Sequence, residues 1–280
     1  MPAASARPPV NKLHFHYLDP YQEGHSPVHN TDSRVKVVLT VAFILTTALI
    51  PIGAWPIYIF LYTVVFSLII LADVGPIRIL KRSLLAVPFV LAALPLVFTT
   101  PGEQVLSINL GSWQLTATAN GLEKFVSIGL KSWISVQAAT LLIFTTQFPD
   151  ILGAMRALRV PRLLVAIFSL MWRYLFVLAD EALRMRRARS ARSGDSGIRG
   201  LKKGGTISWR AKIAGGMAGN LFMRSLDRSE RIYTAMLSRG YDGEVRSIPL
   251  PGLKTSQWII LILGLSALGL LILLSVLIGG

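Results

Sequence analysis

Apolar runs that approach the thickness of a lipid bilayer constrain this chain more than any other feature. The clearest one extends from Trp258 to Ile278, 21 residues without a charge. A helix needs about 20 mainly apolar residues to cross the hydrocarbon core, and in lipid its backbone groups must be satisfied within the segment. Charged residues make up only 15% of the chain, where about a quarter is usual for soluble domains. The sequence therefore predicts an all-α integral membrane protein.

Five such runs predict about five transmembrane helices, joined by short turns and one long polar segment. The runs are Val37–Ile50, Trp55–Leu71, Leu84–Phe98, Gly121–Phe148 and Trp258–Ile278. Pro88 and Pro95 in the third run predict kinks. The predicted organisation is an N-terminal tail (1–33), a four-helix transmembrane part (34–148), a coupling domain (149–255) and a C-terminal transmembrane helix (256–280).

The distribution of charge predicts the orientation of these spans. Residues 148–257 hold 20 Lys and Arg against 8 Asp and Glu, a balance of +12 out of a net +15. Because basic loops stay on the cytoplasmic side, this segment, loop 73–83 and the N-terminus are predicted to be cytoplasmic. The same rule explains the basic pI without nucleic acid. Loop 101–120 lacks Lys and Arg, which predicts an external position, and it alternates about Gly111 as a β-hairpin would.

Residues 163–178 form a further apolar stretch, which is predicted to be a helix at the cytoplasmic interface. Arg173 lies in its middle, and an arginine at mid-membrane depth is costly. A full span here would also move the basic segment outside, against the charge rule. Length alone satisfies a span, so both placements stay open at this point.

The rest of the basic segment is predicted to be a glycine-rich loop followed by an amphipathic helix. Residues 194–219 hold eight glycines, with weak helical content only around Trp209–Met217. The helix from about Asn220 to Ser238 places apolar and basic residues on separate stripes. The apolar stripe contains Phe222, Leu226, Tyr233 and Met236, and the basic stripe contains Arg224, Arg228, Arg231 and Arg239.

Two short arginine motifs end the two basic helices. The first arginine signature is Ala191-Arg192-Ser193 and the second is Ser238-Arg239-Gly240. Arginine and glycine at a helix end are typical of ordinary capping. Exposed arginines also form bidentate contacts with carboxylates of another chain, and a repeated contact suits a partner with two similar subunits. Ala188-Arg189-Ser190 offers a second register for the first signature.

Catalytic and metal sites have little support in this sequence. There is no cysteine, and all four histidines lie in the tail, at His14, His16, His25 and His29. A metal-binding tail is one interpretation, but the spacing matches no ligand geometry, so ordinary surface histidines are favoured. The basic segment holds no histidine and no paired catalytic carboxylates. We therefore expect no catalytic residue, no metal ligand and no cofactor in this chain.

The region around these signatures resembles the coupling region of energy-coupling factor transporters. Residues 162–193 and Arg228–Gly243 carry the resemblance, together with Thr31–Lys36 and the Ala157–Pro161 turn. It extends over roughly residues 28–275. The family is the transmembrane T component, and the branch most similar to this chain is CbiQ of cobalt systems.

This resemblance implies a T subunit that couples two ATPases to a substrate-binding membrane subunit. By match with two Ala-Arg-Gly-like signatures, Arg192 and Arg239 would dock into the ATPases, although the signatures read Ala-Arg-Ser and Ser-Arg-Gly here. The implied partners are two copies of a CbiO-like ABC ATPase, which bind the ATP, and a CbiM-like subunit with or without a small CbiN-like one. We assign Leu163, Ile167, Leu170 and Tyr174 to the contact with the membrane subunit.

The implied activity is uptake of cobalt ions across the bacterial cytoplasmic membrane, without catalysis by this chain. A nickel or vitamin importer of the same type would look similar. A secondary transporter acting alone would need ionisable groups at mid-membrane depth, and Asp and Glu are absent from the interiors of the proposed spans. A membrane enzyme acting on anionic lipid lacks the catalytic groups described above.

Overall fold

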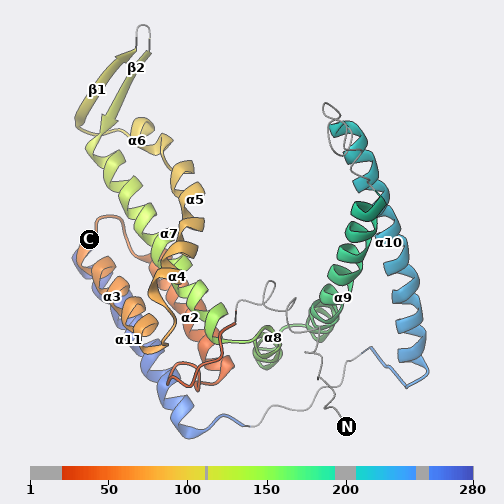
Figure 1. Ribbon diagram of the computed structural model, residues 1–280. Helices are drawn as coiled ribbons and strands as arrows, with labels where there is room; N and C mark the ends of the chain where they lie inside the picture. Colours follow the sequence, from red (N-terminus) through yellow and green to blue (C-terminus); the bar gives the residue numbers. More distant parts are fainter. Residues whose placement is uncertain (1–20, 111–112, 193–205, 244–251, 280) are drawn as a thin grey trace, which may run out of the picture. The chain divides into compact units, whose positions relative to one another are not determined.

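The structure, a computed structural model, describes residues 21–110, 113–192, 206–243 and 252–279, which divide into two units (Figure 1). Unit 1 comprises Met1–Leu158 and Leu250–Gly280, and unit 2 comprises Arg159–Pro249. The first boundary lies ten residues beyond the predicted end of the transmembrane part at residue 148. The reason is helix α8 (Phe148–Ala157), which packs against α2 (Ser33–Leu49) and so belongs to unit 1.

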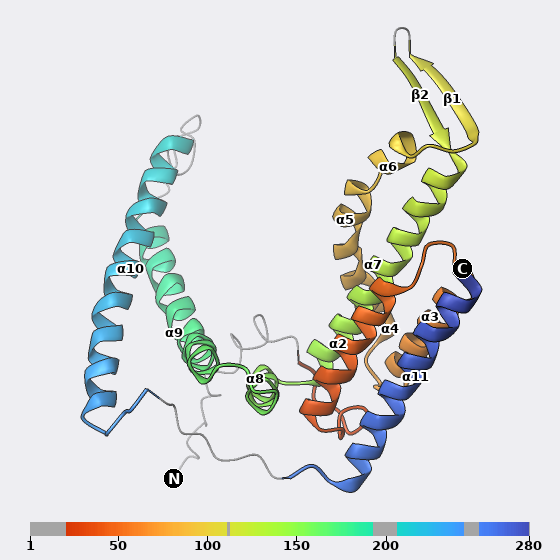
Figure 2. The same ribbon diagram turned by 180° about the vertical axis from the view of Figure 1, so that it is seen from behind.

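Four long helices build most of unit 1: α2, α3 (Trp55–Leu71), α7 (Ala119–Thr145) and α11 (Thr255–Gly279). Asp32 begins α2, because its carboxylate accepts a hydrogen bond from the Arg34 backbone N–H at 2.9 Å. Helix α11 lies alongside α2 although more than 200 residues separate them in the chain (Figure 2). Asp32 N–H donates to Gln257 Oε1 at 3.1 Å, which ties the starts of the two helices together.

The core of unit 1 lies between α2, α3, α7 and the short helix α4 (Pro76–Ser83). Leu61 and Ile134 are completely buried there, and Leu268 of α11 packs against the same cluster. Tyr58 is also buried and donates its hydroxyl to Pro51 O at 2.6 Å. Because this hydrogen bond to the α2–α3 turn satisfies the hydroxyl, the Tyr58 ring can lie in the core.

The predicted third span is a segmented helix that begins earlier than the apolar run. Helix α4 occupies most of the predicted loop 73–83, and η1 (Leu84–Ala86), α5 (Val87–Ala92) and α6 (Pro95–Thr99) follow it. Pro88 and Pro95 each lie in the first turn of a new segment, where a missing N–H breaks no internal bond. The predicted kinks are therefore confirmed, and the predicted loop is wrong because Pro76 starts a helix there.

The predicted β-hairpin is confirmed. Strands β1 (Gln104–Leu110) and β2 (Trp113–Thr118) pair antiparallel, with an irregularity between Gln104 and Leu106. Thr118 joins the hairpin to α7: its hydroxyl donates to Thr100 O at 2.8 Å and accepts from Gly121 N–H at 3.2 Å. Apart from this hairpin, the regular secondary structure of the described residues is helical, in agreement with the predicted fold class.

Four helices in the described part of the chain are long and apolar enough to cross a membrane. They are Pro76–Thr99, Ala119–Thr145, Arg162–Arg192 and Thr255–Leu277, and Trp55–Leu71 is a shorter apolar helix. Three of them match the predicted third, fourth and fifth spans. Helices α2 and α3, with 17 residues each, measure about 25 Å at 1.5 Å per residue, slightly less than a hydrocarbon core.

Two lysines join helix ends inside unit 1. Lys36 donates to Thr145 O at the end of α7 (2.9 Å) and to His29 O at 3.0 Å. Lys131 of α7 donates to the carbonyls of Ala48 and Ile50 at the end of α2. Both ammonium groups thus meet carbonyls that the last helical turn leaves without an internal partner.

Unit 2 is a pair of long helices, α9 (Arg162–Arg192) and α10 (Ile207–Leu237). The predicted glycine-rich loop is wrong for its second half, because α10 starts at Ile207 and continues through Gly215, Gly216 and Gly219. Thr206 caps this start by accepting a hydrogen bond from Trp209 N–H at 3.3 Å. Each glycine lowers helix stability by about 1 kcal/mol, but it does not by itself stop a capped 31-residue helix. Residues 194–205 of the predicted loop lie outside the described residues.

Candidate coupling surface

The first arginine signature lies at the end of α9. Ala191 and Arg192 are exposed on its last turn, and Ser193 lies outside the described residues. Arg189, the alternative register, is half-buried, with its guanidinium carbon 5.9 Å from the ring centre of Trp209 at the start of α10. For Arg192 the structure records no such contact within its described part. Arg189 therefore helps to join the two helices, and Arg192 is the more accessible of the two arginines.

The second arginine signature forms the C-terminal cap of α10. Tyr241 N–H donates to Met236 O at 3.0 Å, and Gly240 N–H donates to Leu237 O at 2.9 Å. This pair of bonds is a Schellman motif, which needs a left-handed residue at Gly240, and its φ is +79°. Ser238 and Arg239 are exposed directly before it. The left-handed turn thus explains why a glycine follows Arg239, and it leaves the Arg239 side chain in solvent.

The two signatures lie at opposite ends of α10. The Arg189–Trp209 contact places the end of α9 beside the start of α10, and Arg239 follows its last turn (Figure 1). A helix of 31 residues is about 46 Å long at 1.5 Å per residue. One pocket of a partner therefore cannot hold both arginines. The antiparallel α9–α10 pair therefore holds the two arginines far apart.

The apolar residues proposed for a membrane-subunit contact lie along the first half of α9. Leu163 and Ile167 are 62% and 50% exposed, and Leu170 and Tyr174 are half-buried. The guanidinium carbon of Arg173 lies 6.0 Å from the Tyr174 ring centre, so this charge contacts an aromatic face next to the apolar stripe. Across the whole of α9 only Ala166 is buried. The helix therefore has much apolar surface to offer to a partner or to lipid.

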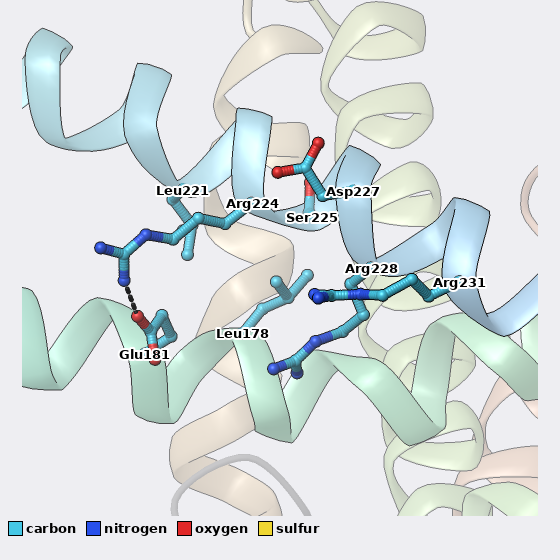
Figure 3. Close-up of a pocket in the computed structure, with 8 residues that line it drawn as sticks. All are labelled: Leu178, Glu181, Leu221, Arg224, Ser225, Asp227, Arg228 and Arg231. Carbon is cyan, nitrogen blue, oxygen red and sulfur yellow. Dashed lines mark hydrogen bonds and ion pairs between the residues drawn. The ribbon is translucent and has the colours of Figure 1, made fainter.

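A cleft between α9 and α10, which the sequence does not reveal, lies farther along the pair (Figure 3). Its lining comprises Leu178, Glu181, Leu221, Arg224, Ser225, Asp227, Arg228 and Arg231. Glu181 forms an ion pair with Arg224 across the helices. Asp227 lies four residues before Arg231 on the same helix, but Figure 3 shows its carboxylate turned away from Arg231. The basic stripe was visible in the sequence, but its neighbours on α9 were not.

Metal-ligating groups do not cluster in the described part of the chain: no group of three or more His, Cys, Asp or Glu residues is close enough to hold an ion. His29 uses both ring nitrogens. Nε2 lies 3.1 Å from Gln22 O and must donate to it, so Nδ1 accepts from the Ser26 hydroxyl at 2.7 Å. His14 and His16 lie outside the described residues. Instead of a metal site, helices α9 and α10 present exposed basic and apolar side chains.

Comparison with known proteins shows the family to which this sequence is similar. The family model CbiQ, described as a cobalt transport protein, matches residues 24–249. The cobalt transport protein CbiQ of Rhodobacter capsulatus is 33% identical over 155 residues, which are 55% of this chain and 60% of that protein. The energy-coupling factor transporter transmembrane protein EcfT of Ruminiclostridium cellulolyticum is 23% identical, over 88% of this chain and 91% of its own length.

A third relative is a fusion. A protein of Methanocorpusculum labreanum named as a fused cobalt transport protein, CbiMQ, is 25% identical over 89% of this chain but only 41% of its own length. The match to the family model covers most of the chain, and both arginine signatures lie within the matched residues 24–249. This multi-pass membrane protein therefore belongs to the CbiQ family, the transmembrane components of energy-coupling factor transporters.

Proposed function

We propose that this chain couples two cytoplasmic ATPases to a substrate-binding membrane subunit, in an importer of cobalt ions. The observation that carries the proposal is the position of Arg192 and Arg239, which are exposed at opposite ends of the α9–α10 pair: Arg192 ends α9 beside the start of α10, and Arg239 follows the end of α10, a helix about 46 Å long. Each arginine docks onto one ATPase, and movement of the ATPases during ATP binding and hydrolysis displaces the two ends of α10. The chain itself holds no nucleotide, no cofactor and no catalytic group.

The substrate-binding subunit contacts the apolar stripe of α9. Leu163, Ile167, Leu170 and Tyr174 recur at helical spacing, and the first two are at least half exposed. The fused relative, whose name joins CbiM to CbiQ, supports a CbiM-like partner beside this chain. We place α9 at the cytoplasmic interface of the bilayer and the N-terminus in the cytoplasm, in agreement with the distribution of positive charge.

Charge reversal at both signatures tests the coupling role. In Arg192→Glu with Arg239→Glu, repulsion from carboxylates of the ATPases should abolish co-purification of the ATPases and reduce ATP-driven cobalt uptake at least about tenfold. The matched control reverses Arg184 and Lys212, which are exposed on the same two helices. Normal uptake and assembly in the double variant would refute the proposal, and uptake without ATPases would favour a secondary transporter.

The same assay decides the register of the first signature. Arg192→Gln should weaken ATPase binding, while Arg189→Gln should mainly lower the thermal stability, because it removes the contact with Trp209. Stronger loss of ATPase binding in Arg189→Gln would assign the signature to residues 188–190. The cargo is tested by uptake of labelled cobalt in competition with nickel, and preferential transport of nickel would overturn the cobalt assignment.

A further inference from the structure

The cleft of Figure 3 lies where the surface of α9 changes from apolar to charged. From Leu163 to Leu178 the helix is apolar apart from Ser169 and Arg173, and Asp180 and Glu181 then begin its charged half. Leu178 and Glu181 both line the cleft, so the cleft coincides with this change. If the apolar half of α9 lies in the membrane interface, the cleft lies at the depth of the lipid headgroups.

Two arginines face this cleft without a counter-charge. Glu181 neutralises Arg224, but neither Arg228 nor Arg231 has an ion-pair partner in the part of the chain that the structure describes. Figure 3 shows both guanidinium groups directed to the same side of the cleft, near Leu178. The Asp227 carboxylate points away from them. Arg228 is half-buried, so its charge is less well solvated than that of an arginine in open solvent.

Two neighbouring positive charges repel each other unless an anion lies between them. A guanidinium group presents a planar set of donors that matches two oxygens of a phosphate, and two such groups surround one phosphate efficiently. The cleft adds apolar side chains, Leu178 and Leu221, beside these donors. A free anion would gain nothing from them, but the glycerol and acyl parts of a phospholipid would.

We infer that Arg228 and Arg231 bind the phosphate of an anionic phospholipid headgroup from the cytoplasmic leaflet. The bound lipid lies in the cleft between α9 and α10 and holds this part of unit 2 against the membrane surface. The site is separate from Arg192 and Arg239, so it does not depend on docking of the ATPases. It would add a lipid requirement to a chain that otherwise acts through protein contacts.

Titration with short-chain lipids tests the site. The full chain in mild detergent is titrated with dioctanoyl phosphatidylglycerol, and bound lipid is counted by native mass spectrometry. The wild type should bind one molecule at least about tenfold more tightly than Arg228→Gln with Arg231→Gln, since each charge-assisted contact contributes strongly. The control Arg184→Gln with Arg187→Gln, which alters two exposed arginines of α9, should bind like the wild type.

A second variant separates the loss of the site from a loss of folding. Arg228→Lys with Arg231→Lys keeps both charges and should keep the melting temperature, but it should bind the lipid more weakly because lysine cannot form the bidentate contact. Equal affinity in all variants would show unspecific attraction and overturn the proposal. Inorganic phosphate that binds as tightly as the lipid would assign the site to a free anion instead.

A protein carboxylate is the remaining alternative for this cleft. In nanodiscs that contain only phosphatidylcholine, the glutamine double variant should bind the ATPases and the membrane subunit as the wild type does. If it loses either partner there, the arginines bind an acidic residue of that partner, and the lipid assignment is wrong. The variant Arg192→Glu with Arg239→Glu should lose its partner proteins but should still bind the lipid. The two proposals therefore fail independently.

Discussion

Unit 1 contains its own core, whereas unit 2 has almost none. In unit 1, α2, α3, α4 and α7 bury a continuous cluster around Leu61 and Ile134. In unit 2, α10 has no buried residue and α9 has one, Ala166. Much of the apolar surface of unit 2 is therefore exposed in the structure. The difference shows that internal contacts determine the shape of unit 1, while the two helices of unit 2 bury little of their surface against the described chain.

Glycines give the sharpest test of this comparison, because the same substitution should have opposite effects in the two units. A Cβ added at Gly121 would lie 2.6 Å from Val97 O and 2.9 Å from Leu96 O, both backbone atoms. Because backbone cannot move aside cheaply, Gly121→Ala should reduce the free energy of unfolding by about 2 kcal/mol or more. Unfolding by a denaturing detergent measures the change.

Gly129 supplies the control for this substitution in the same helix, α7. Its added Cβ would approach Val90 no closer than 3.5 Å, an ordinary contact. Gly129→Ala should therefore be neutral or slightly stabilising. If Gly121→Ala proved equally harmless, the close packing of α7 against α6 would be wrong.

In unit 2, glycine substitution should stabilise the protein. Nothing lies within 4 Å of a Cβ added at Gly215, Gly216 or Gly219. Gly216→Ala should raise the free energy of unfolding of the isolated chain by about 0.5–1 kcal/mol, because alanine is the better helix former. Circular dichroism during thermal unfolding measures it. A loss of stability would show that another part of the chain contacts this face.

The smallest expected effect concerns the attachment of the N-terminal segment to unit 1. Burial lowers the pKa of His29 below its ordinary value of 6.5, and the charges of Lys36 and His25 act in the same direction against the hydrogen bond to Gln22. The folded state thus binds fewer protons than the unfolded state. The stability from this group is present above the ordinary pKa and is lost as pH falls from there through the folded-state pKa.

Thermal unfolding at two pH values measures this effect. Between about pH 7.5 and about pH 5.5, the melting temperature of the wild type should fall more than that of His29→Gln, in which this titration is absent. Equal pH dependence in the two proteins would assign the effect to other groups.

Local patterns predicted much of this molecule because they depend on neighbours in the chain. The kinks follow from Pro88 and Pro95, and the end of α10 follows from the Schellman turn that Gly240 permits. The hairpin follows from alternating residues about Gly111. The prediction of a loop over residues 207–219 was wrong because it relied on the glycines alone. It did not consider that Thr206 could cap a helix start.

The sequence by itself determined the membrane class, the predicted orientation and the two arginine signatures, since hydropathy, charge and motif spacing are properties of the chain in order. Only the tertiary structure decided that α9 and α10 run antiparallel, with Arg189 against Trp209 and Glu181 paired with Arg224. That pairing places Arg192 and Arg239 at opposite ends of α10 and brings Arg228 and Arg231 to the cleft. Side chains from distant parts of the chain make these contacts, and sequence spacing carries no information about which helices will pack together.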